Sequence, residues 1–583
     1  MPHRAHLTTV RVSSALRDAL RAEKYSARSL RADALAGLTV AIVAMPLAMA
    51  LAIAVGVPPQ YGLYSAIVGG IVAALTGGSR FSVTGPTAAF VVVLAPISAR
   101  FGIGGLATAG LMAGVFLIVL GVARFGRLVE YVPEPVTVGF TSGIAFVIAV
   151  LQLNDFLGLG VTSMPEHFAE KVLVLASALP HIAWPAALVG VVTLGVKLAW
   201  PAERFRIPGY APAIVVGALL AVALGALGHP VDTIGTRFSY EIAGVVGHGV
   251  PRVLPQFALP WMLPGPSGEP FALTLATLRE LLPAAVTIAA LGAIESLLCA
   301  VVLDRASKTR HHSNGELVGL GIANVAAPFF GGIPVTAAIA RSIVNVKAGG
   351  RTPFSAAFHA IFVLLGVLLL APLLSYVPMA SMAAVLLNVA WNMSEAPTAV
   401  ELMRRAPRPD RLVLVVCFGL TVVFDMVVAI AVGMVLAAFL FLRDVARFTQ
   451  VRDITMSERY VGEPLPPGWR VVKVTGAMFF AAAERVLSQL LAETDDGSGI
   501  IVYADGVTVL DAGGVGALER FEEECTARGI RVLIADLQQQ PARTARAALI
   551  GAESACLEVV PTLAEAIAIA RQGAPLPCGR LAS

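Results

Sequence analysis

Charged side chains are scarce in this chain of 583 residues, since Asp, Glu, Lys and Arg together make up only 14% of it. A soluble domain carries about 25%, so the low share excludes a protein that is soluble along its whole length. Apolar residues reach 57%, and the mean hydropathy is +0.80. Residues 34–442 are mainly long apolar runs, whereas residues 1–32 are polar and rich in Arg. The sequence therefore predicts an α-helical membrane protein with polar ends.

Cysteine is also scarce, with five residues scattered along the chain. None forms a CxxC pair or stands at a Cys/His spacing that would hold a metal, so neither a disulfide framework nor a metal site is expected. No nucleophile or nucleotide-binding constellation is recognisable, which argues against an enzyme and against a cofactor. The net charge of +4 lies in short loops, where it reports topology and indicates no nucleic-acid partner. No secretory signal peptide is expected, because the first apolar run starts near Ala34 without a short basic tip.

About fourteen apolar elements follow one another between residues 33 and 445, which we interpret as a transmembrane transport domain. A spanning helix needs about 20 largely apolar residues. Ten runs come close to this length: 34–56, 61–78, 104–124, 135–153, 183–200, 210–228, 283–304, 315–330, 354–372 and 379–393. Residues 410–442 hold two shorter runs. Two more, at 86–98 and 336–347, are too short to cross alone.

The Lys and Arg residues favour one set of loops when the basic arm, residues 1–32, is placed in the cytoplasm. The cytoplasmic loops then hold Arg80, Arg124, Arg127, Lys197, Arg204, Arg206, Arg305, Lys308, Arg310, Lys347, Arg351 and the cluster at 404–411. The outer loops hold fewer: Arg100, Lys171, Arg237, Arg252 and Arg279. This bias predicts a multi-pass protein of the inner membrane with both termini in the cytoplasm.

The two short runs form a pair. Each follows an extended stretch with Gly and Pro, and Thr87-Ala88-Ala89 recurs as Thr336-Ala337-Ala338. Pro46 precedes the first triplet, and Glu295 the second, by the same number of residues. With seven elements in each half, the second half enters from the opposite side, which predicts a 7+7 inverted repeat. The repeats span about 33–228 and 283–445. Such interrupted segments at matching places point to a transporter's midplane site, although a chance match in an Ala-rich chain is the alternative.

Arg341 lies about one turn into the second short run. Helix N-termini carry partial positive charge and unpaired N–H groups, so two half-helices that meet at mid-membrane would form an anion site. A guanidinium adds a permanent charge and a fork of donors suited to a carboxylate or sulfate. The alternative is an arginine that reaches the cytoplasmic surface, but Lys347 and Arg351 already fill that position.

Glu295 lies in the middle of a predicted span, where a carboxylate is costly and suggests function. Burial favours its protonated form and pairing with Arg341 its ionised form, and a structural ion pair is the alternative. Cys299 lies one turn on and is interpreted as a packing residue. Leu47 and Leu51 would line the cavity or simply pack between helices. Four further groups are interpreted as structural, interfacial or capping: Asp304, Glu316, His359 and Asp425.

The tail beyond the last span, residues 453–575, alternates between short β-rich and helical segments, and residues 576–583 form a final tail. Strands are predicted at 471–476, 500–507, 531–537 and 557–560, with helices between them. This alternation predicts an α/β domain with a mostly parallel sheet. The turn at Asp511-Ala512-Gly513-Gly514 is interpreted as a tight turn at a helix start, although such a turn could also hold a phosphate.

The chain resembles the SulP (sulfate permease, solute carrier 26) anion transporters over nearly its whole length. The matching motifs are VPPQYGLYSAIVGGIVAALTGGSRFSVTGPTAAF, LGAIESLLCAVVLD and ELVGLGIANVAAPFFGGIPVTAAIARS. The tail resembles a STAS domain. FGRLVEYVPEPVTVGFTSGIAF, LLNVAWNMSEA and MFFAAAE are most similar to the aerobic C4-dicarboxylate transporters of enteric bacteria.

The resemblance implies core and gate domains, a homodimer, and substrate between the third and tenth elements. Carried over by motif, the substrate contacts fall on Thr87, Ala88, Ala89, Thr336, Ala337, Ala340 and Arg341. Sodium-coupled bicarbonate members have Asp and Thr where this chain has Glu295 and Cys299. A thiol is a poor Na⁺ ligand, so we expect coupling to protons, carried by Glu295. The 511–514 turn lacks the hydroxyl that anti-sigma-factor antagonists phosphorylate, so no such switch is expected.

These features predict a proton-coupled transporter that imports C4-dicarboxylates such as succinate, fumarate and aspartate. Sulfate or bicarbonate transport on the same scaffold is the first alternative. An anion channel, or a sensor whose STAS domain reports ligand occupancy, is the second. The expected partners are the anion, protons, the bilayer and a second copy of the chain, and nothing in the sequence identifies a partner of the STAS domain.

Overall fold

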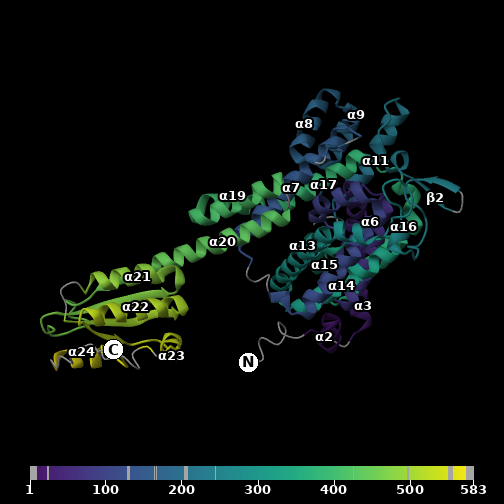
Figure 1. Ribbon diagram of the computed structural model, residues 1–583. Coiled ribbons are helices and arrows are strands. Elements are labelled where there is room, and N and C mark those ends of the chain that lie inside the picture. The colour runs from purple at the N-terminus through teal and green to yellow at the C-terminus, as the bar shows by residue number, and fades with distance from the viewer. Residues whose placement is uncertain are drawn as a thin grey trace. The chain divides into compact units, whose positions relative to one another are not determined.

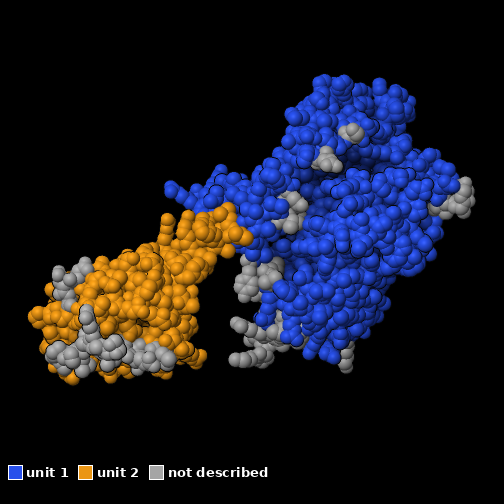
Figure 2. All heavy atoms as spheres, in the orientation of Figure 1, with its two compact units in different colours: residues 1–434 blue, residues 435–583 orange. Residues whose placement is uncertain are grey.

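The computed structural model divides the chain into two compact units, residues 1–434 and 435–583, which Figure 2 distinguishes by colour. The residues that the structure describes are 10–22, 25–127, 132–162, 164–165, 167–201, 208–242, 245–424, 426–494, 498–548, 550 and 556–572. We describe each unit by itself.

The first unit consists of two groups of helices (Figure 1), each of which takes members from both halves of the chain. The first group is α3 (Ala27–Val55), α4 (Pro59–Tyr64), η2 (Ser65–Gly69), α5 (Gly70–Thr76), α6 (Ala88–Val122), α13 (Leu275–Ser307), α14 (Ser313–Ala326), α15 (Ile339–Lys347) and α16 (Phe354–Leu374). The second group is α7 (Glu134–Leu157), α9 (Trp184–Ala199), α11 (Tyr210–Ala226), α17 (Met379–Met393) and α19 (Arg408–Val423). We call the first group the core and the second the gate.

Shorter elements and one long helix complete this part of the chain. They are α2 (Ser14–Ala22), α8 (Phe168–Ala178), η4 (Leu179–His181), α12 (Ile234–Arg237), β2 (Ser239–Ile242), β3 (Val245–His248), η5 (Pro260–Met262), η6 (Ala327–Phe330), α18 (Ala396–Arg405) and α20 (Met426–Phe448). Among the described residues, six helices are long and apolar enough to cross a membrane, or seven if the bent pair of 168–181 and 184–199 counts as one span. The sequence did not predict α8, which meets α9 at 109°.

Part of the basic arm packs on the core. Helix α2 lies against α5, and the Ser13 N–H donates to the carbonyl of Thr76 at 2.8 Å. Asp18 is also on α2, and one of its carboxylate oxygens lies 2.8 Å from His312 Nε2. Ala15 and Ala19 are buried there. Part of the predicted basic arm is therefore folded against the core.

The third predicted element is part of a longer, broken helix. Helical hydrogen bonding extends from Ala88 to Val122, but Gly102 has φ 66° and ψ −168°, so the chain kinks there. A Cβ at Gly102 would lie 2.4 Å from the carbonyl carbon of Gly265. Gly102 thus provides both the backbone conformation and the close approach that separate a half-helix from the span that follows.

Two short strands cross in front of the half-helices and pair with each other. Strand β1 (Thr84–Gly85) runs antiparallel to β4 (Thr336–Ala337), with Thr84 opposite Ala337 and Gly85 opposite Thr336. Antiparallel pairing relates the two interrupted segments by a local two-fold axis, in keeping with an inverted repeat. The equivalence of Thr87 with Thr336 stays a prediction.

The start of α16 is held by a buried carboxylate, Asp33 on α3, that sequence reasoning missed. Its Oδ1 accepts from the backbone N–H groups of Arg351 at 2.6 Å and Thr352 at 3.1 Å. Its Oδ2 accepts from Thr352 Oγ1 at 2.6 Å and from the Tyr25 hydroxyl at 3.3 Å. This one side chain ties α3 to the loop between α15 and α16.

Asp33→Ala is expected to destabilise the first unit by about 2–5 kcal/mol, because it leaves several donors at a buried site without an acceptor, at about 1–3 kcal/mol each. The apparent melting temperature of the detergent-solubilised protein measures this. Glu280→Ala is the control, since Glu280 pairs with Arg100 at the surface and such pairs contribute at most about 1 kcal/mol. Equal melting temperatures for Asp33→Ala and Glu280→Ala would contradict the role of Asp33 in holding the start of α16.

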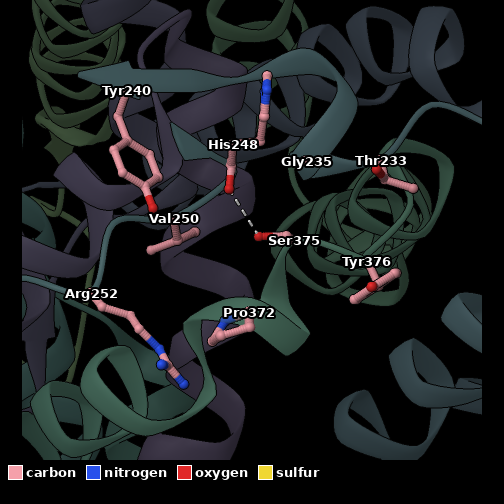
Figure 3. Close-up of a pocket in the computed structure, with 9 residues that line it drawn as sticks. All are labelled: Thr233, Gly235, Tyr240, His248, Val250, Arg252, Pro372, Ser375 and Tyr376. Carbon is pink, nitrogen blue, oxygen red and sulfur yellow. Dashed lines mark hydrogen bonds between the residues drawn. The ribbon is translucent and has the colours of Figure 1, made fainter. Parts of the chain in front are cut away.

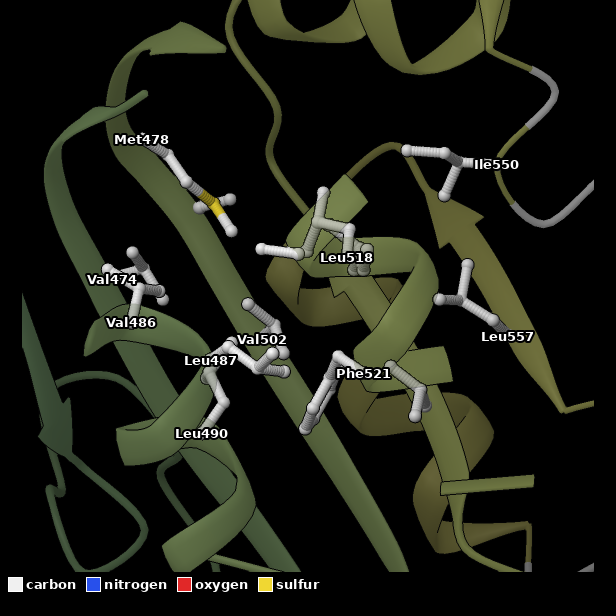
Figure 4. Packing of buried hydrophobic residues seen from close by; sticks show 14 of the residues in the cluster. Val474, Met478, Val486, Leu487, Leu490, Val502, Leu518, Phe521, Ile550 and Leu557 are labelled. Carbon is white, nitrogen blue, oxygen red and sulfur yellow. The ribbon is translucent and has the colours of Figure 1, made fainter. Parts of the chain in front are cut away.

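The second unit is a five-stranded sheet in the order β5-β6-β7-β8-β9. Its elements are β5 (Gln450–Asp453), β6 (Trp469–Met478), α21 (Phe480–Ala492), β7 (Gly499–Leu510), α22 (Ala512–Ala527), β8 (Arg531–Ala535), α23 (Gln539–Ala547), β9 (Leu557–Val560) and α24 (Leu563–Arg571). Strands β6 to β9 are parallel, which confirms the predicted sheet, and the unpredicted β5 adds an antiparallel edge. Figure 4 shows apolar side chains of α21 and α22, including Leu490 and Phe521, packed beside Val502 of β7.

The turn at residues 511–514 is a tight junction between two helix starts. Asp511 Oδ1 accepts from the Gly514 N–H at 2.9 Å, and its Oδ2 accepts from the Phe480 N–H at 3.1 Å. A Cβ at Gly514 would lie 2.3 Å from the carbonyl oxygen of Met478. The protein's own carboxylate therefore caps the start of α22, in agreement with the turn interpretation.

Gly514→Ala is expected to destabilise the second unit by about 1–3 kcal/mol, the usual cost of overpacking. Gly516 lies two residues on in the same helix with nothing within 4 Å of its Cβ position, so Gly516→Ala is a matched control that should be neutral or stabilising. Hydrogen exchange of β7 in the full chain should accelerate only in the Gly514 variant. Faster exchange in both variants would show that the close approach is not the cause.

Candidate functional site

Two helix N-termini meet at the β1–β4 crossing. Helix α6 begins at Ala88, after Thr87, and α15 begins at Ile339, after Ala338. The Ala338 N–H donates to the carbonyl of Val83 at 3.0 Å, which fixes the two segments side by side. Each N-terminus contributes partial positive charge and backbone donors that have no partner within their own helix. The crossing is therefore an electropositive point in an apolar surrounding.

Arg341 is the third residue of α15, and its side chain is fully buried at this crossing. Its Nη2 donates to the carbonyl of Pro86, just before α6. Among the described residues, its Nε and Nη1 have no hydrogen-bond partner. A Cβ at Gly85 would lie 2.5 Å from Nη1, so the guanidinium rests directly on the β1 backbone. Full burial does not fit the alternative of an arginine that reaches the aqueous surface.

Glu295 reaches the same crossing from α13. Its Oε2 accepts from the Thr87 hydroxyl at 3.0 Å. The Thr87 side chain makes no capping hydrogen bond to α6, so the first N–H groups of the helix stay available. Thr336 contacts α13 one turn earlier, where its hydroxyl donates to the carbonyl of Gly292 at 3.2 Å. Both threonines thus tie the crossing to the helix that carries Glu295.

The other predicted site residues divide into two sets. The structure buries Ala88, Ala89 and Ala337 at the crossing. It exposes Ala340 on α15, beside the buried Arg341. Leu47 and Leu51 are buried in α3, which packs against both α6 and α15.

Sequence reasoning missed two groups that shape the crossing. Ser342 Oγ accepts from the Val83 N–H at 2.9 Å and lies 3.5 Å from Cys299 Sγ, so Cys299 packs as predicted. The π-helical turn η2 lies behind β1, where Ser65 Oγ accepts from the Ile333 N–H at 2.7 Å. Nothing in an apolar run signals a π turn, although such turns often occur at functional sites.

Three of the four remaining titratable groups can be placed. Glu316 is buried and accepts from the Gly78 N–H, the Ser79 N–H and the Ser296 hydroxyl, which agrees with a structural role. Asp304 lies 2.8 Å from His311 Nδ1. His359 is fully buried on α16, and among the described residues neither of its ring nitrogens has a partner. Asp425 lies outside the described residues.

Comparison with known proteins identifies the family to which this helical architecture and crossing belong. The family model described as "Sulfate permease family" matches residues 30–417, which is more than half of the chain. The chain belongs to the sulfate permease family. A second model, the STAS domain, matches residues 464–566. The protein is thus an anion transporter with a C-terminal STAS domain, and it is not an enzyme.

Two relatives of this sulfate permease family member illustrate the similarity. A protein of Bacillus subtilis (strain 168) named as a candidate sulfate transporter, YvdB, is 36% identical over 518 residues, which cover 89% of this chain and 93% of the relative. The bicarbonate transporter BicA of Picosynechococcus is 30% identical over 442 residues, which cover 74% of this chain and 73% of the relative. These two relatives are named for sulfate and bicarbonate, and neither is named for C4-dicarboxylates.

Solved structures share the fold of this sulfate permease family member. The murine anion transporter Slc26a9 in its inward-facing state superposes with a TM-score of 0.79 at 19% identity, covering 94% of this chain and 93% of that chain. The transmembrane domain of a cyanobacterial BicA superposes with a TM-score of 0.58 at 27% identity, covering 71% of this chain and 98% of that one. The arrangement of transmembrane helices followed by a STAS domain is therefore that of solute carrier 26 proteins.

Proposed function

We propose that this protein is a secondary active transporter that takes up C4-dicarboxylates such as succinate, fumarate and aspartate together with protons. The observation that carries the proposal is Arg341, a fully buried cation with two donors, Nε and Nη1, that no described residue accepts from. A buried charge without a partner is strongly disfavoured. A bound anion supplies the missing partner.

The charge at the crossing favours a divalent anion. Each helix N-terminus contributes roughly half a positive charge, and Arg341 adds a full one, so the sum is about +2 when Glu295 is protonated and about +1 when it is ionised. A dicarboxylate or sulfate matches the charge of the protonated form, whereas bicarbonate leaves it half neutralised. Thr87, Ala88, Ala89, Thr336 and Ala337 would supply the walls and backbone donors of the site. Leu47, Leu51 and Ala340 belong to the proposed lining as well.

Sulfate or bicarbonate is the second candidate substrate, because YvdB and BicA carry these names. Sulfate satisfies the charge argument as well as a dicarboxylate does. A guanidinium binds both classes of oxyanion through parallel N–H donors.

Proton coupling completes the proposal. Glu295 is the carboxyl group at the crossing, and it already accepts from Thr87. Protonation of Glu295 would remove a negative charge next to the anion, so proton and anion would favour each other's binding. We place the protein in the inner membrane with both termini in the cytoplasm, as a homodimer, in accordance with the positive-inside bias and the family resemblance.

Uptake of labelled succinate, sulfate and bicarbonate by one proteoliposome preparation tests substrate and mechanism together. We expect saturable uptake of a divalent anion that rises when the outside is made acidic. Uptake of bicarbonate alone would contradict the charge argument. Current without saturation, and without response to the proton gradient, would identify an anion channel instead.

A further inference from the structure

A cavity lies at the connection between the core and the gate. It has a volume of about 380 Å³, within the range of small-molecule sites, roughly 300–1,000 Å³. Its lining residues are Thr233, Gly235, Tyr240, His248, Val250, Arg252, Pro372, Ser375 and Tyr376. Figure 3 shows Tyr240 and Arg252 on one side of it and Ser375 and Tyr376 on the other. Helix α16 of the core ends here, and α17 of the gate begins at Met379.

The walls of this cavity are preformed by hydrogen bonds between two segments far apart in the sequence. The Ile234 N–H donates to the carbonyl of Val377 at 2.9 Å, and the Gly235 N–H to that of Ser375 at 2.8 Å. The Met379 N–H donates in return to the carbonyl of Asp232 at 2.9 Å. These bonds hold residues 232–235 against the turn between α16 and α17.

Glycines allow the close packing around the cavity. Gly249 has φ +87°, and a Cβ there would lie 2.0 Å from Ser375 Oγ. Gly247 pairs with Tyr240 across the β2–β3 hairpin, and its missing side chain leaves room for the Tyr240 ring. Ser375 Oγ donates to the carbonyl of His248 at 3.3 Å. The Tyr240 hydroxyl and the Ser375 side chain are thereby fixed on opposite sides.

The charge of the lining is of one sign. Arg252 and His248 are its ionisable basic residues, and no Asp or Glu lines it. Within the described part of the chain, Arg252 takes part in no ion pair, whereas Arg237 pairs with Asp155 at 2.6 Å. An unpaired guanidinium beside the Tyr240 hydroxyl suits an oxyanion.

We propose that this cavity binds a small oxyanion through Arg252 and Tyr240, with Ser375 as part of its wall, separately from the crossing at Arg341. The ligand class is sulfate, phosphate or carboxylate, either as a free ion or as the phosphate of a lipid headgroup. The cavity lies at the end of α16 that is remote from Asp33, which is the extracytoplasmic end in the proposed orientation. An anion held there bridges the connection between core and gate.

Binding of labelled inorganic sulfate to the full chain in phosphatidylcholine nanodiscs tests this proposal, with Arg341→Ala as background to remove the crossing site. We expect a saturable component to remain in Arg341→Ala. Adding Arg252→Ala should weaken it about tenfold, the loss of one charge-assisted hydrogen bond. Adding Arg279→Ala should leave it unchanged, because Arg279 is an exposed arginine of α13 outside the lining.

The source of the oxyanion follows from a second arm with phosphatidylglycerol in the nanodiscs. If phosphatidylglycerol competes with sulfate and this competition disappears in Arg252→Ala, the ligand is a headgroup phosphate. If the lipid does not compete with sulfate, the ligand is a free ion. No saturable component in Arg341→Ala, or equal affinities in the Arg252 and Arg279 variants, would overturn the proposal. Arg341→Ala could instead bind sulfate with the wild-type affinity, and the added Arg252→Ala substitution could abolish that binding. This pair of results would refute the crossing as the main site and would support the cavity.

Discussion

Arg341→Ala is expected to abolish saturable substrate binding at the crossing while the protein still inserts and folds. The substitution removes the full charge at the crossing and the two donors, Nε and Nη1, that have no partner in the described structure. A hydrogen bond to a charged group contributes about 1.5–3 kcal/mol. Loss of two therefore costs about 3 kcal/mol or more, which is roughly 100-fold or more in Kd. Equilibrium binding of labelled succinate or sulfate in detergent measures the effect.

Two further variants separate charge from geometry. Arg341→Lys keeps the charge but loses the planar fork, so binding should stay weak. Gly85→Ala keeps Arg341 intact, but the new Cβ would lie 2.5 Å from Nη1 and must displace the guanidinium. We expect weakened binding in Gly85→Ala at an unchanged melting temperature. A Kd near the wild-type value in Arg341→Ala would contradict the assignment of the site.

Glu295→Gln is expected to uncouple transport from the proton gradient. Glutamine mimics the protonated carboxyl, and its amide oxygen can still accept from the Thr87 hydroxyl that now lies 3.0 Å from Oε2. Substrate should therefore bind and exchange, but an inward proton gradient should no longer drive accumulation. Importing a divalent anion against a negative interior costs about 2.3 kcal/mol per charge per 100 mV, so the uncoupled variant should accumulate little substrate.

Glu316→Gln is the matched control for this experiment. Glu316 is also a buried carboxylate of the core, but its oxygens already accept from two backbone N–H groups and a serine hydroxyl. The control should lower the melting temperature and retain gradient-driven accumulation. If Glu295→Gln still accumulates labelled substrate in response to the gradient, another group carries the proton. The fully buried His359 is then the first residue to test.

Much of the helical architecture could be predicted because a helix that crosses lipid must consist mainly of apolar residues. Apolar runs, interruptions with Gly and Pro, and one costly arginine are enough to identify the half-helices and the crossing at Arg341. Burial of Arg341 and the contact between Glu295 and Thr87 agree with those predictions. Such features are visible because an intramembrane charge stands out against an apolar background.

The remaining features depend on backbone geometry, which the identities of the residues do not reveal. The antiparallel pairing of β1 with β4 joins segments far apart in the sequence, and no pattern of residues reports it. The π-helical turn at Ser65–Gly69 and the edge strand at Gln450–Asp453 leave no periodic signal. The role of Asp33 depends on donors far along the chain, since Thr352 is separated from it by 319 positions.

The most direct test of the account is to locate the anion itself. Selenate and 2-bromosuccinate carry anomalous scatterers and stand in for sulfate and a C4-dicarboxylate. A crystal of the protein with whichever of the two competes for uptake should show an anomalous peak between the Arg341 guanidinium and the start of α6, and Arg341→Ala crystals should lack it. A peak elsewhere in the wild type, with none at the crossing, would contradict the account.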